Sequence, residues 1–356
     1  MLWLAGCPKR IAGGYEVSDG KVIYHHGMKG LGTTRASAVK EADPTTFEAL
    51  DRKYGRDKNH AYYDGRIIDG SDGPTFKLIE GQFSGDKNHI YYTAQILTDR
   101  PADFKILFKT KPNVSETTFS TDGKLIFMGN KPFFPDLVHV PTFERLGRSD
   151  YFRDRNRVYT PLRVVKGADA SSFEVVKRFD ERYSYDANSV FYFGVKVEGI
   201  DRATHRVIDN VHHRDQSNIY FAMKQLSDDP DNFKILSKAF SKDSTRVYWR
   251  GRQISDDAAN FVQFPSRGAD AYAKDSKKAY WGWKTIEGVD VESFEGLNDN
   301  YAKDKNAVYF AVNIVNMPRK MEGADPATFA LVKGEKGIDA RDKNRAYNFG
   351  NPKRRN

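Results

Sequence analysis

Asp57-Lys58-Asn59-His60-Ala61-Tyr62-Tyr63 is a stretch that returns, in altered form, along the whole chain. Its aspartate marks copies that are separated by 28 residues (Asp215 to Asp243) to 38 residues (Asp19 to Asp57). Self-similarity at such a period is the signature of solenoids, propellers and arrays. The repeats therefore predict the architecture of the entire molecule. The anchoring aspartates are Asp19, Asp57, Asp86, Asp122, Asp154, Asp186, Asp215, Asp243, Asp275, Asp304 and Asp342.

An aromatic residue stands five positions after every anchor, as Tyr62 and Tyr309 do. The following residue is often aromatic too, and the preceding one is usually Val, Ile or Ala. Aromatic and β-branched residues favour strands, in which successive side chains point to opposite faces. We therefore expect a short strand in each repeat, with one ring in the core and the other lining an outer face. The rings are Tyr24, Tyr62, Tyr91, Phe127, Tyr159, Phe191, Tyr220, Tyr248, Tyr280, Tyr309 and Tyr347.

Two polar motifs predict the connections. Asp-Lys-Asn favours a tight turn between two strands, because Asp binds its own backbone two residues on and Asn tolerates a left-handed conformation. The second motif is represented by Asp43-Pro44-Thr45-Thr46-Phe47 and Asp325-Pro326-Ala327-Thr328-Phe329. Asp as an N-cap before Pro predicts the start of a helix, here of one turn that buries its Phe. His205 stands where that Phe is expected.

A single unit of this size cannot bury its apolar face, so neighbouring repeats must supply the core. We expect an all-β fold with short helical turns, in which tandem repeats form an open or superhelically wound β array. A propeller-like closure and two stacked lobes are the alternatives. Residues 15–350 form the array, with a possible subdivision near 108–152. Residues 1–14 are an N-terminal segment and linker, and residues 351–356 are a basic tail.

The repeated D-K-N-x-x-Y-Y core, followed by Gly, the Asp-Pro-x-Thr-Phe segment and an apolar pair, resembles the DKNYY family of bacterial repeat proteins. The resemblance covers nearly the whole chain. It implies a bacterial and often exported protein, with no agreed enzymatic activity and no catalytic residues to transfer. Two regions depart from the pattern: the copy at Asp19, with Gly20 and Lys21 in place of Lys-Asn, and the inserted segment 108–152. We expect these regions to deviate from the common fold.

Composition and charge limit the class of partner. The chain has 57 Lys and Arg against 48 Asp and Glu, a formal charge of +9, which suits an acidic partner. The basic residues recur once or twice in each repeat instead of forming one patch, which argues against dedicated nucleic-acid binding. No stretch approaches the roughly 20 apolar residues that a membrane span requires.

The only cysteine, Cys7, closes Leu4-Ala5-Gly6-Cys7, which resembles the lipobox of bacterial lipoproteins. The thiol is the lipid acceptor, and small residues pass the signal peptidase. Only Met1, Leu2 and Trp3 precede the box, so the charged and apolar regions of a signal peptide are missing. If the natural start lies upstream, Cys7 is the lipidation site. Pro8, in place of an inner-membrane retention Asp, favours anchoring to the outer membrane, facing the periplasm.

Catalytic and metal-binding patterns are not found in the sequence. The adjacent pairs His25-His26 and His212-His213 diverge on a strand, which is poor geometry for one metal ion. The Asp-x-Asn turns lack the further oxygen ligands and the closing Glu of an EF-hand. There is no G-x-S-x-G motif, Walker loop or catalytic-cysteine context. We therefore expect no enzymatic activity, no metal and no cofactor.

Two functional hypotheses remain. The first is a periplasmic lipoprotein that binds another protein, most economically an immunity protein that neutralises a secreted antibacterial toxin with an acidic surface, such as a phospholipase effector. The second is an envelope-associated structural protein that binds cell-wall polymer or glycan through Trp249, Trp281 and Trp283. For the first, the candidate partner-binding residues lie where repeats break the consensus. They are His205, Arg206, His212, His213, Arg214, Trp249, Arg250 and Arg252.

Overall fold

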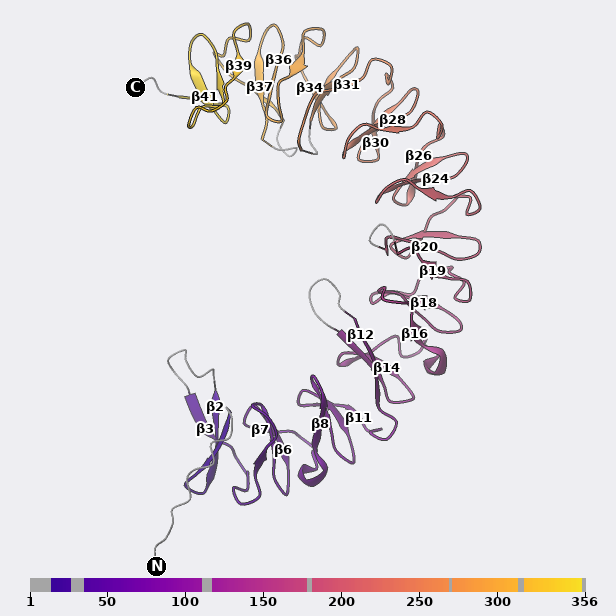
Figure 1. The fold of residues 1–356 in the computed structure, drawn as a ribbon, viewed down its shortest axis with the longest axis vertical. Helices are drawn as coiled ribbons and strands as arrows, with labels where there is room; N and C mark the ends of the chain where they lie inside the picture. Colours follow the sequence, from indigo (N-terminus) through magenta and orange to yellow (C-terminus); the bar gives the residue numbers. More distant parts are fainter. Residues whose placement is uncertain are drawn as a thin grey trace, which may run out of the picture. The chain divides into compact units, whose positions relative to one another are not determined.

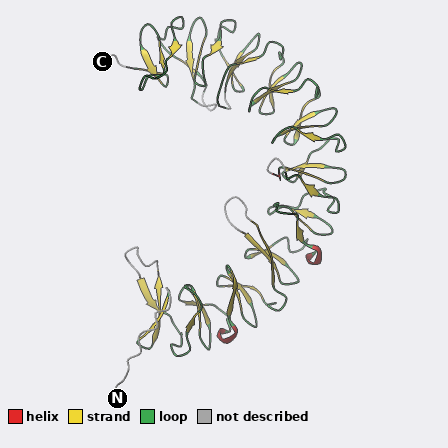
Figure 2. Ribbon diagram, in the orientation of Figure 1, coloured by secondary structure: helices red, strands yellow, loops and turns green. Residues whose placement is uncertain are grey.

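The computed structural model describes residues 14–26, 35–110, 117–177, 181–268, 271–312 and 317–353. Nearly all of the regular structure is β, which confirms the predicted fold class (Figure 1, Figure 2). Within the described residues, the strands form eleven small antiparallel sheets, one for each sequence repeat. No strand of one sheet pairs with a strand of another there, so the sheets do not merge into a barrel.

The chain divides into two compact units at residues 164–172, C-terminal to the segment 108–152 where the sequence suggests a possible subdivision. Unit 1 comprises residues 1–164 and 169–171, and unit 2 the remaining residues to 356. The strands of unit 1 are β1 Tyr15–Ser18, β2 Lys21–His26, β3 Arg35–Ala38, β4 Glu48–Ala49, β5 Tyr54–Arg56, β6 Ala61–Tyr63, β7 Arg66–Ile67, β8 Lys77–Glu80, β9 Phe83–Gly85, β10 Ile90–Tyr92, β11 Gln95–Thr98, β12 Lys105–Thr110, β13 Thr117–Thr121, β14 Ile126–Met128, β15 Lys131–Pro132, β16 Glu144–Arg145, β17 Phe152–Arg153 and β18 Val158–Tyr159.

Unit 2 continues the same pattern with six sheets of four strands each in its described residues. Its strands are β19 Glu174–Val175, β20 Tyr183–Tyr185, β21 Val190–Tyr192, β22 Val195–Lys196, β23 Arg206–Val207, β24 His212–Arg214, β25 Ile219–Phe221, β26 Lys224–Ser227, β27 Lys234–Ile235, β28 Phe240–Lys242, β29 Val247–Trp249, β30 Arg252–Ser255, β31 Val262–Gln263, β32 Tyr272–Lys274, β33 Ala279–Trp281, β34 Lys284–Ile286, β35 Glu295–Gly296, β36 Tyr301–Lys303, β37 Val308–Phe310, β38 Arg319–Lys320, β39 Ala330–Leu331, β40 Ala340–Arg341, β41 Ala346–Asn348 and β42 Asn351–Pro352.

The anchoring aspartate organises each repeat from the turn between its two central strands. Asp86 is representative: its Oδ1 accepts hydrogen bonds from the backbone N–H of Asn88 (2.7 Å) and His89 (2.8 Å). Its Oδ2 accepts from the hydroxyl of Tyr91 (2.8 Å) and from the N–H of Asp72 (2.8 Å). One carboxylate thus fixes the turn, the first core ring and the connection from the preceding repeat.

The same two turn amides reach the carboxylate in every repeat from Asp57 to Asp342. These ten carboxylates are buried, and eight of them also accept from the Tyr hydroxyl five residues on. Burial by itself raises the pKa of the Asp86 carboxyl, but the donors around it outweigh burial and hold the pKa below its usual value. The predicted turn is therefore a buried anionic acceptor site.

The anchor at Asp19 is an exception, as Gly20 and Lys21 in place of Lys-Asn lead us to expect. Asp19 is exposed and forms a two-residue turn with Gly20, with φ of 50° and 69°. Because this turn is shorter, the register shifts by one residue: Tyr24 pairs with Tyr15, as Tyr63 pairs with Tyr54 in the next sheet. Tyr24 therefore occupies the second ring position, and its hydroxyl donates to Asp64 (2.6 Å).

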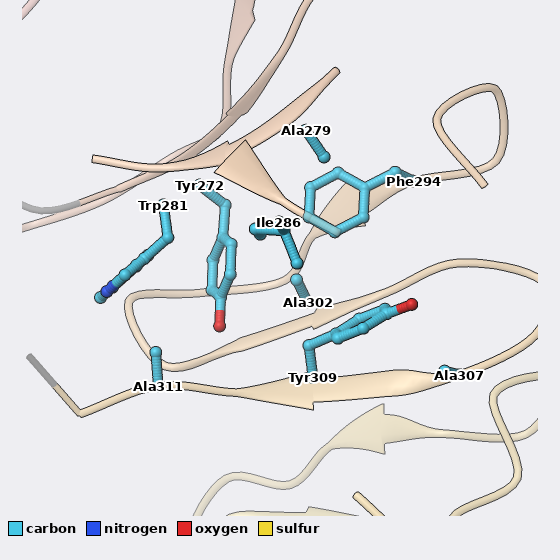
Figure 3. Packing of buried hydrophobic residues seen from close by; sticks show 9 residues of the cluster. All are labelled: Tyr272, Ala279, Trp281, Ile286, Phe294, Ala302, Ala307, Tyr309 and Ala311. Atoms are coloured by element: carbon cyan, nitrogen blue, oxygen red, sulfur yellow. The ribbon is translucent and has the colours of Figure 1, made fainter. Parts of the chain in front are cut away.

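The connecting Phe stacks one sheet on the next. In unit 2, the Phe294 ring lies between Tyr272 of the preceding sheet (6.0 Å between centroids) and Tyr309 of the following one (6.2 Å; Figure 3). Ala302 lies beside it and leaves room for the ring. In unit 1, Gly55 has the same role, since a Cβ there would overlap the Phe47 ring. Stacked rings and small residues thus build a core that continues from repeat to repeat within each unit.

Two expectations about local structure need correction. The connecting segments are predicted to be helical turns, but of these segments, as far as the structure describes them, only η1 (Gly73–Thr75) and η2 (Val140–Thr142) are 3₁₀ turns. The other segments are hydrogen-bonded turns, although their Phe is buried as predicted at Phe294 and Phe329. Segment 108–152 is expected to deviate, but its described residues form ordinary repeat sheets, β12–β15 and the start of β16–β18. The Asp122 carboxylate explains this regularity, because it caps its turn like the others.

We predict that Asp86→Asn destabilises unit 1 by about 2–4 kcal/mol, because it replaces a charged acceptor by an amide whose N–H₂ opposes the donors Asp72 N–H and Tyr91 O–H. Asp19→Asn is the matched control, and its effect should stay within about 0.5 kcal/mol because Asp19 is exposed. Urea unfolding followed by tyrosine fluorescence measures both. Equal midpoints for the two variants would contradict the central role of the buried carboxylate.

Candidate binding surface

The register of each sheet gives the repeat two different ends. In the sheet β4–β7, the Asp57–His60 turn joins β5 to β6 at one end. The β4–β5 and β6–β7 connections both lie at the opposite end, because Tyr54 pairs with Tyr63 and Tyr63 with Arg66. We call the first the anchor end and the second the tip end. The same order recurs in the sheets of unit 2.

The anchor end is occupied by contacts between the two sequence motifs. Lys305 of the turn forms an ion pair with Asp290 of the connecting segment (2.7 Å), and its backbone N–H donates to Ser293 Oγ (3.0 Å). The Lys305 contact is the main cause that lowers the pKa of Asp290 to about 2. Lys58 and Lys87 form equivalent pairs with Asp43 and Asp72. The most regular residues of the chain therefore hold repeats together and are not a candidate site.

The structure contradicts the candidate site at the three histidines. His205, His212 and His213 are buried, so they cannot offer an exposed binding face. His205 takes the place of the connecting Phe, and His213 takes the place of the small residue that faces it, as Ser241 does in the following sheet. His205 is smaller than the Phe that it replaces, and His213 is larger than the Ser that it replaces. The two exchanges together conserve the volume of the core. The departure from the repeat consensus at His205 therefore reflects an exchange of two residues in the core, and it does not mark an exposed surface.

Hydrogen bonds define the state of the histidine pair. His213 Nε2 lies 2.7 Å from the carbonyl oxygen of Ala222, and therefore carries the proton that it donates. Its Nδ1 is then the acceptor for His205 Nε2–H at 3.0 Å. Burial lowers the pKa of His205 to about 3 and that of His213 to about 4. Both rings are neutral packing elements at physiological pH.

The two arginines beside them differ in what they do. Arg206 is exposed, and its guanidinium donates to the carbonyl of His205 (2.7 Å). Arg214 donates to the carbonyl of Pro230 (3.1 Å) and pairs with Asp231 (3.1 Å), which ties β24 to the next connecting segment. Arg214 is therefore engaged within the repeat stack, whereas Arg206 keeps part of its surface available.

Trp249, Arg250 and Arg252 are brought together at the tip end of β29–β30. The guanidinium of Arg250 lies over the Trp249 ring at 4.7 Å, and that of Arg252 lies over Trp283 in the next sheet at 4.3 Å. Both arginines are solvent-accessible, and Trp249 and Trp283 are half-buried. Trp281 is fully buried against Tyr272, so it cannot join an outer aromatic platform (Figure 3). Four of the singled-out residues thus form one cationic and aromatic cluster.

Sequence reasoning missed other exposed side chains at the same tip end. Phe193, Met223 and Phe349 occupy the turns that follow β21, β25 and β41, and all three are exposed. The available signal was the turn directly after the strand that carries the ring five residues from the anchor, where the fold has no structural need for an apolar side chain. Comparing that turn between repeats would have revealed them.

Other candidate features give no site in the part of the chain that the structure describes. No group of three or more His, Cys, Asp or Glu side chains is placed to hold a metal ion there. None of the helices in the described ranges is long and apolar enough to cross a membrane. Cys7 and the tail residues Arg354 and Arg355 lie outside the described residues.

We predict that the histidine pair makes unit 2 sensitive to mild acid. The pKa values of about 3 and about 4 lie below the ordinary value of 6.5, so the unfolded chain binds protons first. This contribution is fully present above pH 6.5 and is lost as the pH falls toward 4, by about 1.4 kcal/mol per pH unit for each ring. The anchoring carboxylates add little in this window, since their ordinary pKa is 3.8.

The double variant His205→Phe with His213→Ser restores the Phe233–Ser241 arrangement of the neighbouring sheet and should flatten this pH dependence. Urea titrations of both proteins between pH 4 and 7, followed by tryptophan fluorescence, measure the slope. The same slope in both proteins would show that other groups cause it.

Comparison with known proteins gives one match. The model of the DKNYY family matches residues 15–163, 151–213 and 212–351, which together span nearly all of the repeat sheets. None of the curated proteins or solved structures matches the chain.

Proposed function

The chain belongs to the DKNYY family, and from this premise we propose that it acts by binding another protein and not by catalysis. The observation that carries this proposal is the cluster of Trp249, Arg250, Arg252 and Trp283 at the tip end of two neighbouring sheets. Aromatic residues and Arg dominate the hot spots of protein interfaces. The side chains of the anchor-end turns pair within the repeat stack, whereas the tip-end turns present exposed side chains that are available for recognition.

The concrete role that we propose is that of an immunity protein that neutralises a secreted antibacterial toxin. Inhibition by capture needs a rigid surface and no chemistry, and the repeat stack offers the former through its buried carboxylates and stacked rings. The net charge of +9 favours a toxin with an acidic surface, because complementary charge accelerates association and aids specificity. A phospholipase effector that acts at the membrane is one such candidate.

A periplasmic location with an outer-membrane anchor at Cys7 completes the proposal. It rests on the Leu4-Ala5-Gly6-Cys7 sequence and on a natural start upstream of Met1. A lipid anchor keeps the protein at the surface where a delivered toxin acts. The anchor also explains why a lone cysteine stands at this end of a chain that has no other.

The alternative, an envelope protein that binds cell-wall polymer or glycan, has less support. Sugar stacking needs open aromatic faces, but Arg252 and Lys284 lie over the Trp283 ring at 4.3 and 5.4 Å. Trp249 Nε1 is buried and has no hydrogen-bond partner among the described residues, so this N–H cannot donate to a sugar. The third ring of that hypothesis, Trp281, is part of the core.

The lipidation proposal predicts that protein expressed from the longer reading frame incorporates labelled fatty acid and partitions into detergent. Cys7→Ser should abolish the label and release the protein into the soluble periplasmic fraction, because the thiol is the lipid acceptor. Adding Ser18→Cys to the Cys7→Ser variant checks that the label requires the lipobox and not merely a thiol. If the wild-type protein stays in the cytosol without a lipid label, the proposed anchor at Cys7 is wrong.

The immunity proposal predicts that cells that carry this protein in the periplasm survive a periplasmic toxin encoded beside its gene. The two purified proteins should form a complex with a dissociation constant in the nanomolar range or below, of the order of 10⁻⁹ M, as tight inhibitors do. Survival assays and calorimetry measure the two effects. A wild-type protein that neither binds nor protects against any neighbouring toxin would end this hypothesis.

A further inference from the structure

Unit 2 exposes apolar and aromatic side chains at the turns that join the third and fourth strands of its sheets. Phe193 is 51%, Met223 47% and Phe349 61% exposed, and Trp283 occupies the same turn of β33–β34. Arg250 fills it in β29–β30. We call these five residues, Phe193, Met223, Arg250, Trp283 and Phe349, the tip row. Exposed apolar side chains of this size can be replaced by polar ones at little cost to stability, so the fold does not require them.

Unit 1 provides an internal comparison, because the same turns exist there. They carry Asp64, Thr93 and Asn130 in the sheets that begin at β4, β8 and β12. Leu162, 84% exposed after β18, is the exception. The same scaffold is therefore built mostly with polar tips in unit 1 and mostly with apolar or aromatic tips in unit 2.

Neighbouring tips of unit 2 are in contact. Gly251, beside Arg250, packs so closely on Phe221 of the preceding sheet that a Cβ would overlap the ring. On the other side, Arg252 reaches over Trp283 of the following sheet at 4.3 Å. Met223, Arg250 and Trp283 therefore belong to three successive sheets whose tip ends touch, and they form a continuous surface.

Three cations of this surface have no carboxylate partner within the described residues. Arg250 and Arg252 lie on tryptophan rings, and within the described part of the chain neither forms an ion pair with a carboxylate. Lys224, exposed beside Met223, has no such partner there either. At the anchor ends, by contrast, Lys58, Lys87 and Lys305 each pair with an aspartate. Arg250, Arg252 and Lys224 are thus available to an external anion.

We propose that the tip row of unit 2 binds an acidic protein surface in which carboxylates flank apolar or aromatic side chains. This rests on the proposed function and specifies its interface. Carboxylates of the partner would take the bidentate geometry that guanidinium groups offer, while its apolar side chains would cover Met223 and the part of Trp283 that Arg252 and Lys284 leave exposed. A bare polyanion does not explain the row, since phosphate or uronate groups gain nothing from contact with exposed Phe and Met side chains.

The test uses the full chain and two kinds of variant. Arg250→Glu with Arg252→Glu reverses the charge, and Met223→Ser with Trp283→Ser removes the apolar contacts. Arg66→Glu with Lys131→Glu is the matched control, because both residues are exposed and begin the fourth strand of unit 1 sheets, as Arg252 does in unit 2. Thermal unfolding should be nearly the same for the wild type and the two charge variants, as surface substitutions usually have little effect on stability. For Met223→Ser with Trp283→Ser, which removes a half-buried ring, it shows whether the protein is still folded at the temperature of the binding assay.

Two probes separate this inference from the proposed function. The first is the toxin encoded beside the gene, measured by calorimetry at low and high salt. The second is a phage-displayed library of random peptides, selected on the wild-type protein. We expect either tip-row variant to weaken toxin binding at least about a hundredfold, with loss of the salt dependence for the charge-reversed one. We expect the selected peptides to be rich in Asp, Glu and aromatic residues. They should bind the unit 1 control variant as well as they bind the wild-type protein.

The possible outcomes separate the interface from the immunity role. Toxin binding that survives both tip-row variants would overturn the interface and leave the immunity role intact. If no toxin binds, acidic peptides that depend on the tip row would support the interface while the immunity role falls. A selection that yields no acidic peptides, or peptides that bind the tip-row variants equally well, would overturn the inference. Binding of the row to vesicles of anionic phospholipid alone would overturn it too.

Discussion

One buried carboxylate in each repeat after the first joins its own turn to other parts of the structure, as Asp86 joins its turn to Tyr91 and to the preceding connection. The anchoring aspartate accepts two amides of its own turn, in most repeats the tyrosine hydroxyl five residues later and, in at least six repeats, an amide of the preceding connection. A carboxylate surrounded by donors is costly to replace, because every one of these groups would lose its acceptor in a dry site. The spacing between the two sequence motifs follows from this geometry: Asp43 must reach Asp57, and Asp290 must reach Asp304.

This interaction confines most structural constraints to one end of the repeat. At the anchor end, Asp, Lys and Thr or Ser each have a specific partner, which explains why these residue types recur. The tip end also holds contacts between repeats, such as the Tyr15 hydroxyl with Lys53 and Gly65, but the exposed side chains of its turns differ in size and chemistry from sheet to sheet. A scaffold divided in this way can vary its recognition surface without disturbing the hydrogen bonds that hold it together.

The sequence was sufficient to predict the features that are local and repeated. The turn chemistry of Asp-Lys-Asn, the strand signal of Tyr62-Tyr63 and the buried Phe of the connecting segment all appear as expected. The sequence was insufficient where a shorter turn shifts the strand register, as the two-residue turn at Asp19 and Gly20 does. The prediction from sequence also failed where two exchanges compensate each other. His205 lies in a connecting segment and His213 in a strand that packs on it, so their contact cannot be predicted from either position alone.

The tip row could not be predicted from the sequence for a different reason, since the fold does not require a particular residue type at those positions. Exposed side chains such as Phe193 and Phe349 contribute little to stability and increase the risk of aggregation. In unit 1 the equivalent positions show that polar residues satisfy the turn equally well. Side chains that folding does not need, and that solubility disfavours, must be explained by contact with something outside the chain. The stacking of Arg250 and Arg252 on tryptophan agrees with this argument, because it presents their guanidinium groups to solvent in a fixed position.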